Sequence, residues 1–140
     1  PAAAPRAPRE KRRSLREVLP GYRIETRLGG HSHDGVAVYR ALQTSLDRPV
    51  ALKVLLPKGA DGPRGVERFV RAAKAIARLP HPNIVTIHDV VARGKLRVLV
   101  MELLAGGSLA DRLEAGPLDV EETLRVAESV AQALAYAHSH

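Results

Sequence analysis

The spacing of hydrophobic positions changes several times along the chain after residue 20. Short apolar runs close to glycine or proline are typical of β-strands, and five such runs are present. They lie at residues 22–29, 36–42, 49–56, 84–91 and 96–101. The polar link at 30–35 has a glycine at each end, so it predicts a hairpin turn between the first two strands.

A helical spacing separates the third predicted strand from the fourth. Apolar residues recur at helical intervals from Val66 to Ala77 and form one continuous face. Pro80 and Pro82 are expected to end this helix, because proline disfavours helical backbone in the residue before it.

Two further helices are predicted after the glycines at 106 and 107. Ser108 is expected to cap a short helix that runs to Leu113. Asp119, with Glu122 three residues later, predicts a capping box for a helix that continues to the end of the chain. The order of elements predicts an α+β fold, with a five-stranded antiparallel sheet, one helix against it, and then the start of a helical region.

The composition excludes several classes of protein. The 140 residues are 45% hydrophobic, which suits a globular fold, and no apolar run approaches the length of a membrane-spanning helix. The absence of cysteine excludes a disulfide scaffold, a thiolate zinc site and a cysteine nucleophile. With no cysteine and no secretory signal, the expected location is cytoplasmic.

The formal net charge of +7 is concentrated at the N-terminus. Residues 1–20 carry six Lys or Arg and two Glu, a net charge of +4. We interpret residues 1–19, which are basic and rich in Pro, Ala and Arg, as a solvated linker. Nucleic-acid binding is the alternative, but no aromatic residue is interleaved with the basic ones, so a solubilising role is favoured.

Lys53 interrupts an otherwise apolar strand. It is expected to share one strand face with Ala51, while Val50, Leu52 and Val54 are expected to face the helix. An unpaired buried ammonium group is costly, so this lysine must pair, reach solvent or meet a ligand. A glycine-bounded hairpin before a strand lysine can bind phosphate in principle, but a lysine at a sheet edge that reaches solvent would explain the pattern equally well.

Lys53 also belongs to an ordered series of motifs. The series comprises Val38 to Ala41, Leu46 to Lys53, Arg68-Phe69, His81 to Val85, Val100 to Leu103 and Gly106 to Leu109. In order and spacing it resembles the N-terminal lobe of a Hanks-type serine/threonine protein kinase of the bacterial kind. The resemblance covers about residues 20–140. It implies an N-lobe at 20–102, then a hinge and the start of the C-lobe, with its helices D and E, at 103–140.

The resemblance also implies a site for ATP and its Mg²⁺ ion. Lys53 would hold the α- and β-phosphates, Met101 would be the gatekeeper, and Glu102 and Leu104 would offer a hinge carbonyl and amide to adenine. The remaining pocket and glycine-loop residues would be Leu28, Gly29, Gly30, Gly35, Val38 and Ala51. The Mg²⁺ ligands and the catalytic Asp are expected beyond His140, so the segment alone is expected to be inactive, and its protein substrate is not specified.

The glycine loop departs from the family pattern. Gly29 matches the first glycine, but His31 and Asp34 stand where the other two are usual. The stretch from Leu28 to Val38 is also two residues longer than usual. Asp34 would place negative charge near the phosphates, which is expected to weaken nucleotide binding.

The predicted helix at residues 66–77 departs from the family pattern at one position. The family's helix C carries a Glu that pairs with the strand lysine, and here that position is Ala72. Glu67 lies roughly 140° away around the helix, which makes it a poor substitute. Ala72 therefore supports an alternative: a pseudokinase that acts as a protein-interaction module with weak or no nucleotide binding.

The histidines are not expected to be central to the site. His31 and His33, with Asp34, form a weak candidate metal site on a turn. His81 is expected to be structural, whereas the last two histidines of the chain, at 138 and 140, are expected to be solvated.

Overall fold

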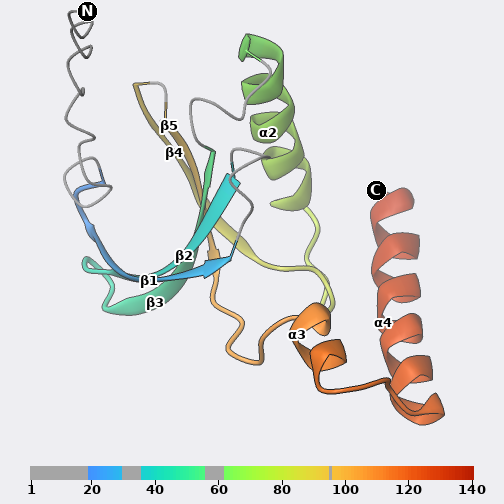
Figure 1. The fold of residues 1–140 in the computed structure, drawn as a ribbon. Coiled ribbons are helices and arrows are strands. Elements are labelled where there is room, and N and C mark those ends of the chain that lie inside the picture. The colour runs from blue at the N-terminus through green and yellow to red at the C-terminus, as the bar shows by residue number, and fades with distance from the viewer. Residues whose placement is uncertain (1–18, 30–35, 56–61, 95) are drawn as a thin grey trace, which may run out of the picture.

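The computed structural model describes residues 19–29, 36–55, 62–94 and 96–140, with side chains in the helix from residue 64. Figure 1 shows a curved sheet with one helix beside it, a short helix below it, and the C-terminal helix standing to one side. The elements are β1 (Tyr22–Gly29), β2 (Val36–Gln43), β3 (Arg48–Leu55), α2 (Gly62–Ile76), β4 (Ile87–Arg93), β5 (Leu96–Glu102), α3 (Leu109–Glu114) and α4 (Val120–His138).

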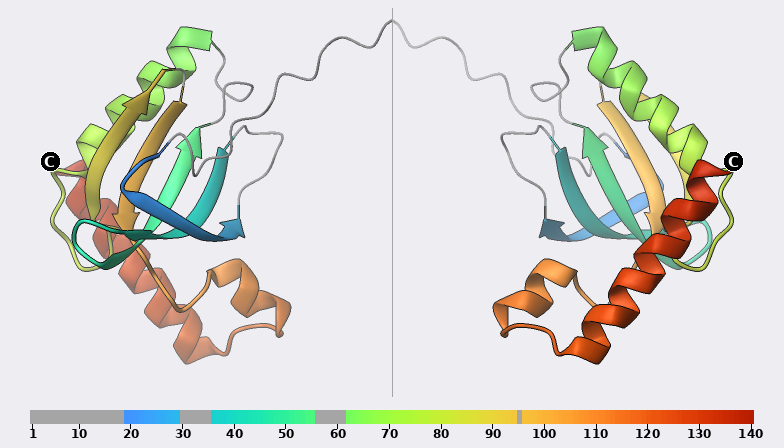
Figure 2. Two further views of the ribbon diagram at one scale, coloured as in Figure 1. Left: turned by 90° about the vertical axis from the view of Figure 1, so that its left-hand side faces the viewer. Right: turned by 90° about the vertical axis from the view of Figure 1, so that its right-hand side faces the viewer.

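The five strands form one antiparallel sheet in the order β1-β2-β3-β5-β4. Consecutive strands pair as hairpins, except that β3 pairs with β5 because α2 lies in the connection from β3 to β4. This arrangement confirms the predicted α+β fold with a five-stranded antiparallel sheet and one helix. The two views in Figure 2 show α2 running beside the strands, α3 below the sheet, and α4 rising from below the sheet toward the lower end of α2.

The hydrophobic core lies on one face of the sheet. Val50, Leu52 and Val54 of β3 are fully buried there and pack with Val98 and Val100 of β5. Leu19 and residues of β1 and β2 complete this cluster, which contains no residue of α2. The prediction that this face of β3 meets the helix is therefore wrong, because the chain before and within β1 covers it instead.

Helix α2 lies nearest to β4 and β5. Its buried residue is Ala73, which is 2% exposed and lies outside the core cluster. The helix ends at Ile76, before the prolines at 80 and 82 that were expected to end it, and a bond from the Ala77 N–H to the Ala73 carbonyl at 2.9 Å closes its last turn.

Helix α3 begins with the cap that its sequence predicts. The Asp111 N–H donates to Ser108 Oγ at 3.1 Å, and the Ser108 N–H donates to Asp111 Oδ2 at 2.7 Å. Hydrogen bonds from the Ser108 side chain and backbone lower the pKa of the Asp111 carboxyl. Both halves of this capping box are present, so the short helix has a defined start.

Helix α4 forms half of its predicted capping box. The Asp119 carboxylate accepts from the Glu122 N–H at 2.7 Å. The Glu122 side chain does not return this bond, because it pairs with Arg112 of α3 through contacts of 2.8 and 3.1 Å. The capping box predicted for α4 is therefore wrong in this half, and the displaced carboxylate joins α3 to α4.

None of the described helices is long and apolar enough to cross a membrane.

Candidate functional site

Cross-strand pairing brings the central candidate residues onto one face of the sheet. Lys53 of β3 pairs with Val38 of β2 on one side and with Leu99 of β5 on the other. In the neighbouring row, Ala51 pairs with Arg40 on one side and with Met101 on the other. Residues that pair directly, or that lie two apart on a strand, share a face. The two rows therefore form one continuous surface, opposite the core.

Lys53 has no acidic partner in the part of the chain that the structure describes. The lysine is half-buried, and its neighbours on the same strand face, Ala51 and Leu55, are 4% and 6% exposed. On α2 both Ala72 and Glu67 are exposed, and the ion pairs among described residues do not include the lysine. Its ammonium group is left available to an anion.

The end of β1 lies beside the same surface. Gly29 pairs with Val38, and the preceding Leu28 is 50% exposed. A side chain at position 29 would meet no atom within 4 Å, so the backbone there is open to approach. Outside the described residues lie Gly30, His31, His33, Asp34 and Gly35. Within the described ranges no group of His, Asp and Glu residues could hold a metal ion.

The hinge candidates follow directly from β5. Met101 and Glu102 are its last residues and are half-buried, while Leu104 is 64% exposed. The Glu102 N–H donates to the Thr86 carbonyl at 3.0 Å, and the Thr86 N–H donates to Glu102 Oε1 at 2.6 Å. Two hydrogen bonds thus hold the end of β5 to the segment that enters β4.

Polar side chains that the sequence did not single out lie near the hinge. His88 lies where the register between β4 and β5 shifts, and burial followed by the Arg48 charge lowers its pKa while Glu102 opposes the shift. Arg48 Nη2 donates to Gln43 Oε1 at 2.7 Å, and its Nε is buried with no partner among the described residues. Burial and then the Asp89 charge raise the pKa of Tyr22, whereas the same Arg48 charge lowers it. No periodic signal marks these residues, because they meet only through the sheet.

Leu99 was also missed in the sequence. It is 7% exposed and lies in the row of Lys53. The signal that would have found it is strand alternation, because it lies two residues before Met101 on the same strand.

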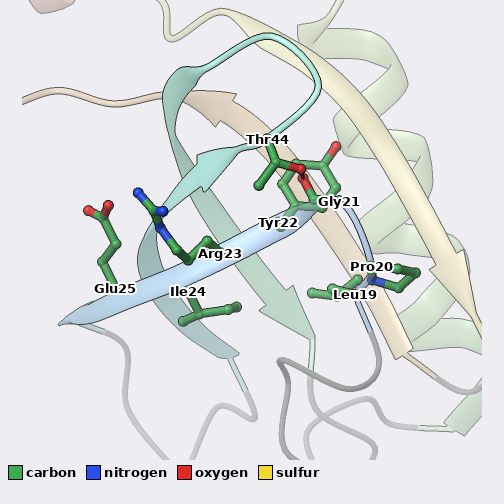
Figure 3. Close-up of a pocket in the computed structure, with 8 residues that line it drawn as sticks. All are labelled: Leu19, Pro20, Gly21, Tyr22, Arg23, Ile24, Glu25 and Thr44. Atoms are coloured by element: carbon green, nitrogen blue, oxygen red, sulfur yellow. Dashed lines mark hydrogen bonds between the residues drawn. The ribbon is translucent and has the colours of Figure 1, made fainter.

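A hollow of about 510 Å³ lies along β1, at the edge of the sheet (Figure 3). It is lined by residues 19–25 and Thr44. None of the candidate nucleotide residues belongs to this lining, so the hollow is separate from the candidate site.

The loop after α2 contacts α4. The rings of His81 and Tyr136 lie 5.1 Å apart, and Asn83 Nδ2 donates to Gln132 Oε1 at 3.3 Å. His81 Nδ1 also accepts from the Asn83 N–H at 3.1 Å, which is consistent with the structural role expected of it. His140 is exposed as predicted, but its ring stacks on Tyr136 at 4.3 Å, so it is not simply solvated.

The fold defines a class of protein. A five-stranded antiparallel sheet, the helix α2 between its third and fourth strands, and helices after the last strand are the small lobe of a protein kinase with the start of the large lobe. Residues 23–140 match the family model described as "Protein kinase domain". The chain therefore belongs to the protein kinase family, among the Hanks-type serine/threonine kinases of bacteria.

Individual relatives show how much of a kinase the chain spans. It is 37% identical over 121 residues to the serine/threonine-protein kinase PrkC of Bacillus subtilis, which is 85% of this chain and 18% of PrkC. It is 41% identical over 102 residues to PknL of Mycobacterium tuberculosis, which is 72% of this chain and 26% of PknL. The crystal structure of the M. tuberculosis PknI kinase domain superposes with a TM-score of 0.71 at 30% identity, over 86% of this chain and 49% of that one. The chain thus spans about a fifth of PrkC, a quarter of PknL and half of the PknI kinase domain.

Proposed function

We propose that this chain forms the ATP-binding part of a kinase that transfers the ATP γ-phosphate to Ser or Thr hydroxyls of proteins. One observation carries the proposal: the rows Val38–Lys53–Leu99 and Arg40–Ala51–Met101 form one sheet face. On this face Lys53 is half-buried among apolar side chains and has no acidic partner among the described residues, whereas Arg40 is exposed and pairs with Glu25. Such a surface suits a flat apolar base next to a chain of phosphates. The division into a linker at 1–19, an N-lobe at 20–102 and a hinge with C-lobe start at 103–140 is part of this proposal.

The residues take separate roles in the proposed site. Lys53 attracts the α- and β-phosphates, and the glycines at 29, 30 and 35 allow backbone N–H groups to approach phosphate oxygens. Leu28, Val38 and Ala51 cover one side of the adenine ring, and Met101 closes the back of the pocket. The Glu102 carbonyl and the Leu104 amide hydrogen-bond the adenine edge.

Magnesium would bridge and neutralise the phosphates when bound. The described residues do not fit a Mg²⁺ site, because they contain no cluster of acidic or histidine side chains. We therefore assign no step of the reaction to a metal held by this chain. The proposed partners are ATP and a protein substrate in the cytoplasm, without nucleic acid.

The second candidate is a pseudokinase that binds partner proteins. Two observations favour it: the position of the pairing acid on α2 is Ala72, which is exposed, and Lys53 forms an ion pair with none of the described residues. Without that ion pair the lysine is free to adopt other rotamers, which weakens its hold on phosphate. This candidate predicts weak or absent ATP binding.

Calorimetric titration of the chain with ATP tests the two candidate functions. We expect Lys53→Met to lower ATP affinity about tenfold, since a charge-assisted contact is lost. Lys74→Met is the matched control, because Lys74 is an exposed lysine on α2, and it should leave the affinity unchanged. Ala72→Glu should raise the affinity by supplying the missing acid. Equal affinities for all four proteins would refute the assigned role of Lys53, and absence of ATP binding in all of them would favour the pseudokinase.

A further inference from the structure

The end of β5 departs from regular strand pairing in one bond. The pair Ile87–Met101 sets the register of β4 against β5, so the next residues outward, Thr86 and Glu102, lie opposite each other. In an antiparallel pair of this kind each residue donates its N–H to the carbonyl of the other. The first of these bonds is present, from the Glu102 N–H to the Thr86 carbonyl at 3.0 Å.

The second bond has a different acceptor. The Thr86 N–H donates to the Glu102 carboxylate, at 2.6 Å from Oε1, rather than to the Glu102 carbonyl. Glu102 as a residue is half-buried, although this bond is exposed, and a bond to an ionised acceptor is shorter and stronger than one to a neutral carbonyl. The side chain of Glu102 thus replaces its own backbone carbonyl as the partner of β4.

Because the carboxylate accepts from the Thr86 amide, that amide does not occupy the Glu102 carbonyl. In a regular pair, the carbonyl of residue 102 would be held against Thr86 as a sheet acceptor. That carbonyl is also the group that the proposed function assigns to the adenine 6-amino group. We propose that the Glu102 carboxylate is a positioning group that satisfies the Thr86 amide and so leaves the Glu102 carbonyl available to the 6-amino group of the nucleotide. The inference rests on the proposed function.

A purely structural role for Glu102 makes a different prediction. If its carboxylate only fastened β4 to β5, its loss would weaken the binding of every purine nucleotide to the same extent. If it frees the carbonyl, its loss weakens only nucleotides that donate a hydrogen bond from position 6. The informative quantity is the ratio of two affinities, that for ATP and that for purine ribonucleoside triphosphate, which lacks the 6-amino group.

Calorimetric titration of the chain with these two nucleotides tests the inference. The wild type and Glu102→Gln, whose amide oxygen still accepts from Thr86, should prefer ATP about tenfold, since one hydrogen bond separates the ligands. Glu102→Ala should reduce the preference to about twofold or less, because the Thr86 amide then takes the backbone carbonyl. The control is Glu25→Ala, which removes an exposed carboxylate paired with Arg40 at 2.9 Å and should retain the preference.

Removal of the competing donor should reverse the effect. Proline has no N–H, so Thr86→Pro added to Glu102→Ala should restore the preference for ATP. A Glu102→Ala protein that keeps the full preference, or a Glu102→Gln protein that loses it, would overturn the inference.

A ligand-free measurement separates this inference from the proposed function. If the wild type binds neither nucleotide, the proposed function fails, and NMR still tests the geometry. Scalar coupling across the hydrogen bond between the Thr86 amide nitrogen and the carbonyl carbon of residue 102 should be absent in the wild type and present in Glu102→Ala. Coupling in the wild type would overturn the inference, whatever the nucleotide affinities.

Discussion

At the scale of single residues, His88 makes stability depend on pH. Its pKa is lowered from the usual 6.5, first by burial and then by the Arg48 charge, so the unfolded chain binds a proton more readily than the folded one. The stability contributed by neutral His88 is therefore present at pH values above about 6.5 and is lost as the pH falls below that value.

Urea unfolding of the wild type and His88→Gln between pH 8 and pH 5 measures this effect. Glutamine does not titrate in this range, so the variant should lose less of its free energy of unfolding than the wild type as the pH falls. His138→Gln is the control, because His138 is exposed at the end of α4 and the same substitution there should leave the pH profile unchanged. Parallel profiles for the wild type and His88→Gln would contradict the assignment.

At the scale of elements, the cap of α4 is the clearest separate contribution. Asp119 accepts from the Glu122 N–H, one of the four amides that the start of a helix leaves without a helical partner. Asp119→Ala should lower the free energy of unfolding by about 1 kcal/mol, measured by urea denaturation followed by circular dichroism, while Asp119→Ser should retain most of it. Glu121→Ala is the control, with an expected change within about 0.5 kcal/mol, because its side chain is 82% exposed and lies 3.8 Å from Arg125. Equal losses for Asp119→Ala and Glu121→Ala would refute the cap.

The bounds of the strands show how far local sequence pattern predicts an element. The bounds of β1 follow from local pattern, because a glycine precedes the strand and another ends it. The start of β4 was placed three residues early: the apolar residues from Ile84 onward were assigned to the strand, but a turn bond from the Ile84 N–H to the His81 carbonyl at 3.0 Å holds the chain out of the sheet there. Local hydrophobicity does not distinguish an apolar turn from a strand.

The candidate site was predicted only as far as its residues belong to motifs along the chain. Lys53, Met101 and Glu102 were identified from motifs along the chain, but Leu99 and His88 join them only through strand register. Register is a property of two strands together and is weakly marked in either sequence alone. For the same reason, the side of β3 that meets the helix was assigned wrongly.

At the scale of the whole molecule, α4 leaves a stripe of apolar side chains in solvent. One face of the helix carries Val120, Leu124 and Leu134, which are separated by about one and about three helical turns. They are 77%, 64% and 51% exposed. The helix is nevertheless continuous to His138, where Ser139 caps it. A contiguous apolar stripe of this kind favours association more than scattered apolar residues do.

We therefore expect the 140-residue chain to bind a hydrophobic dye and to associate as its concentration rises. Leu124→Ser with Leu134→Ser should reduce dye fluorescence and shift sedimentation velocity profiles toward the monomer, because the stripe is interrupted. Leu46→Ser is the matched control: Leu46 is 63% exposed but stands alone in the turn between β2 and β3, so its loss should change neither readout. If the double variant binds dye and associates as strongly as the wild type, the apolar surface responsible lies elsewhere than on α4.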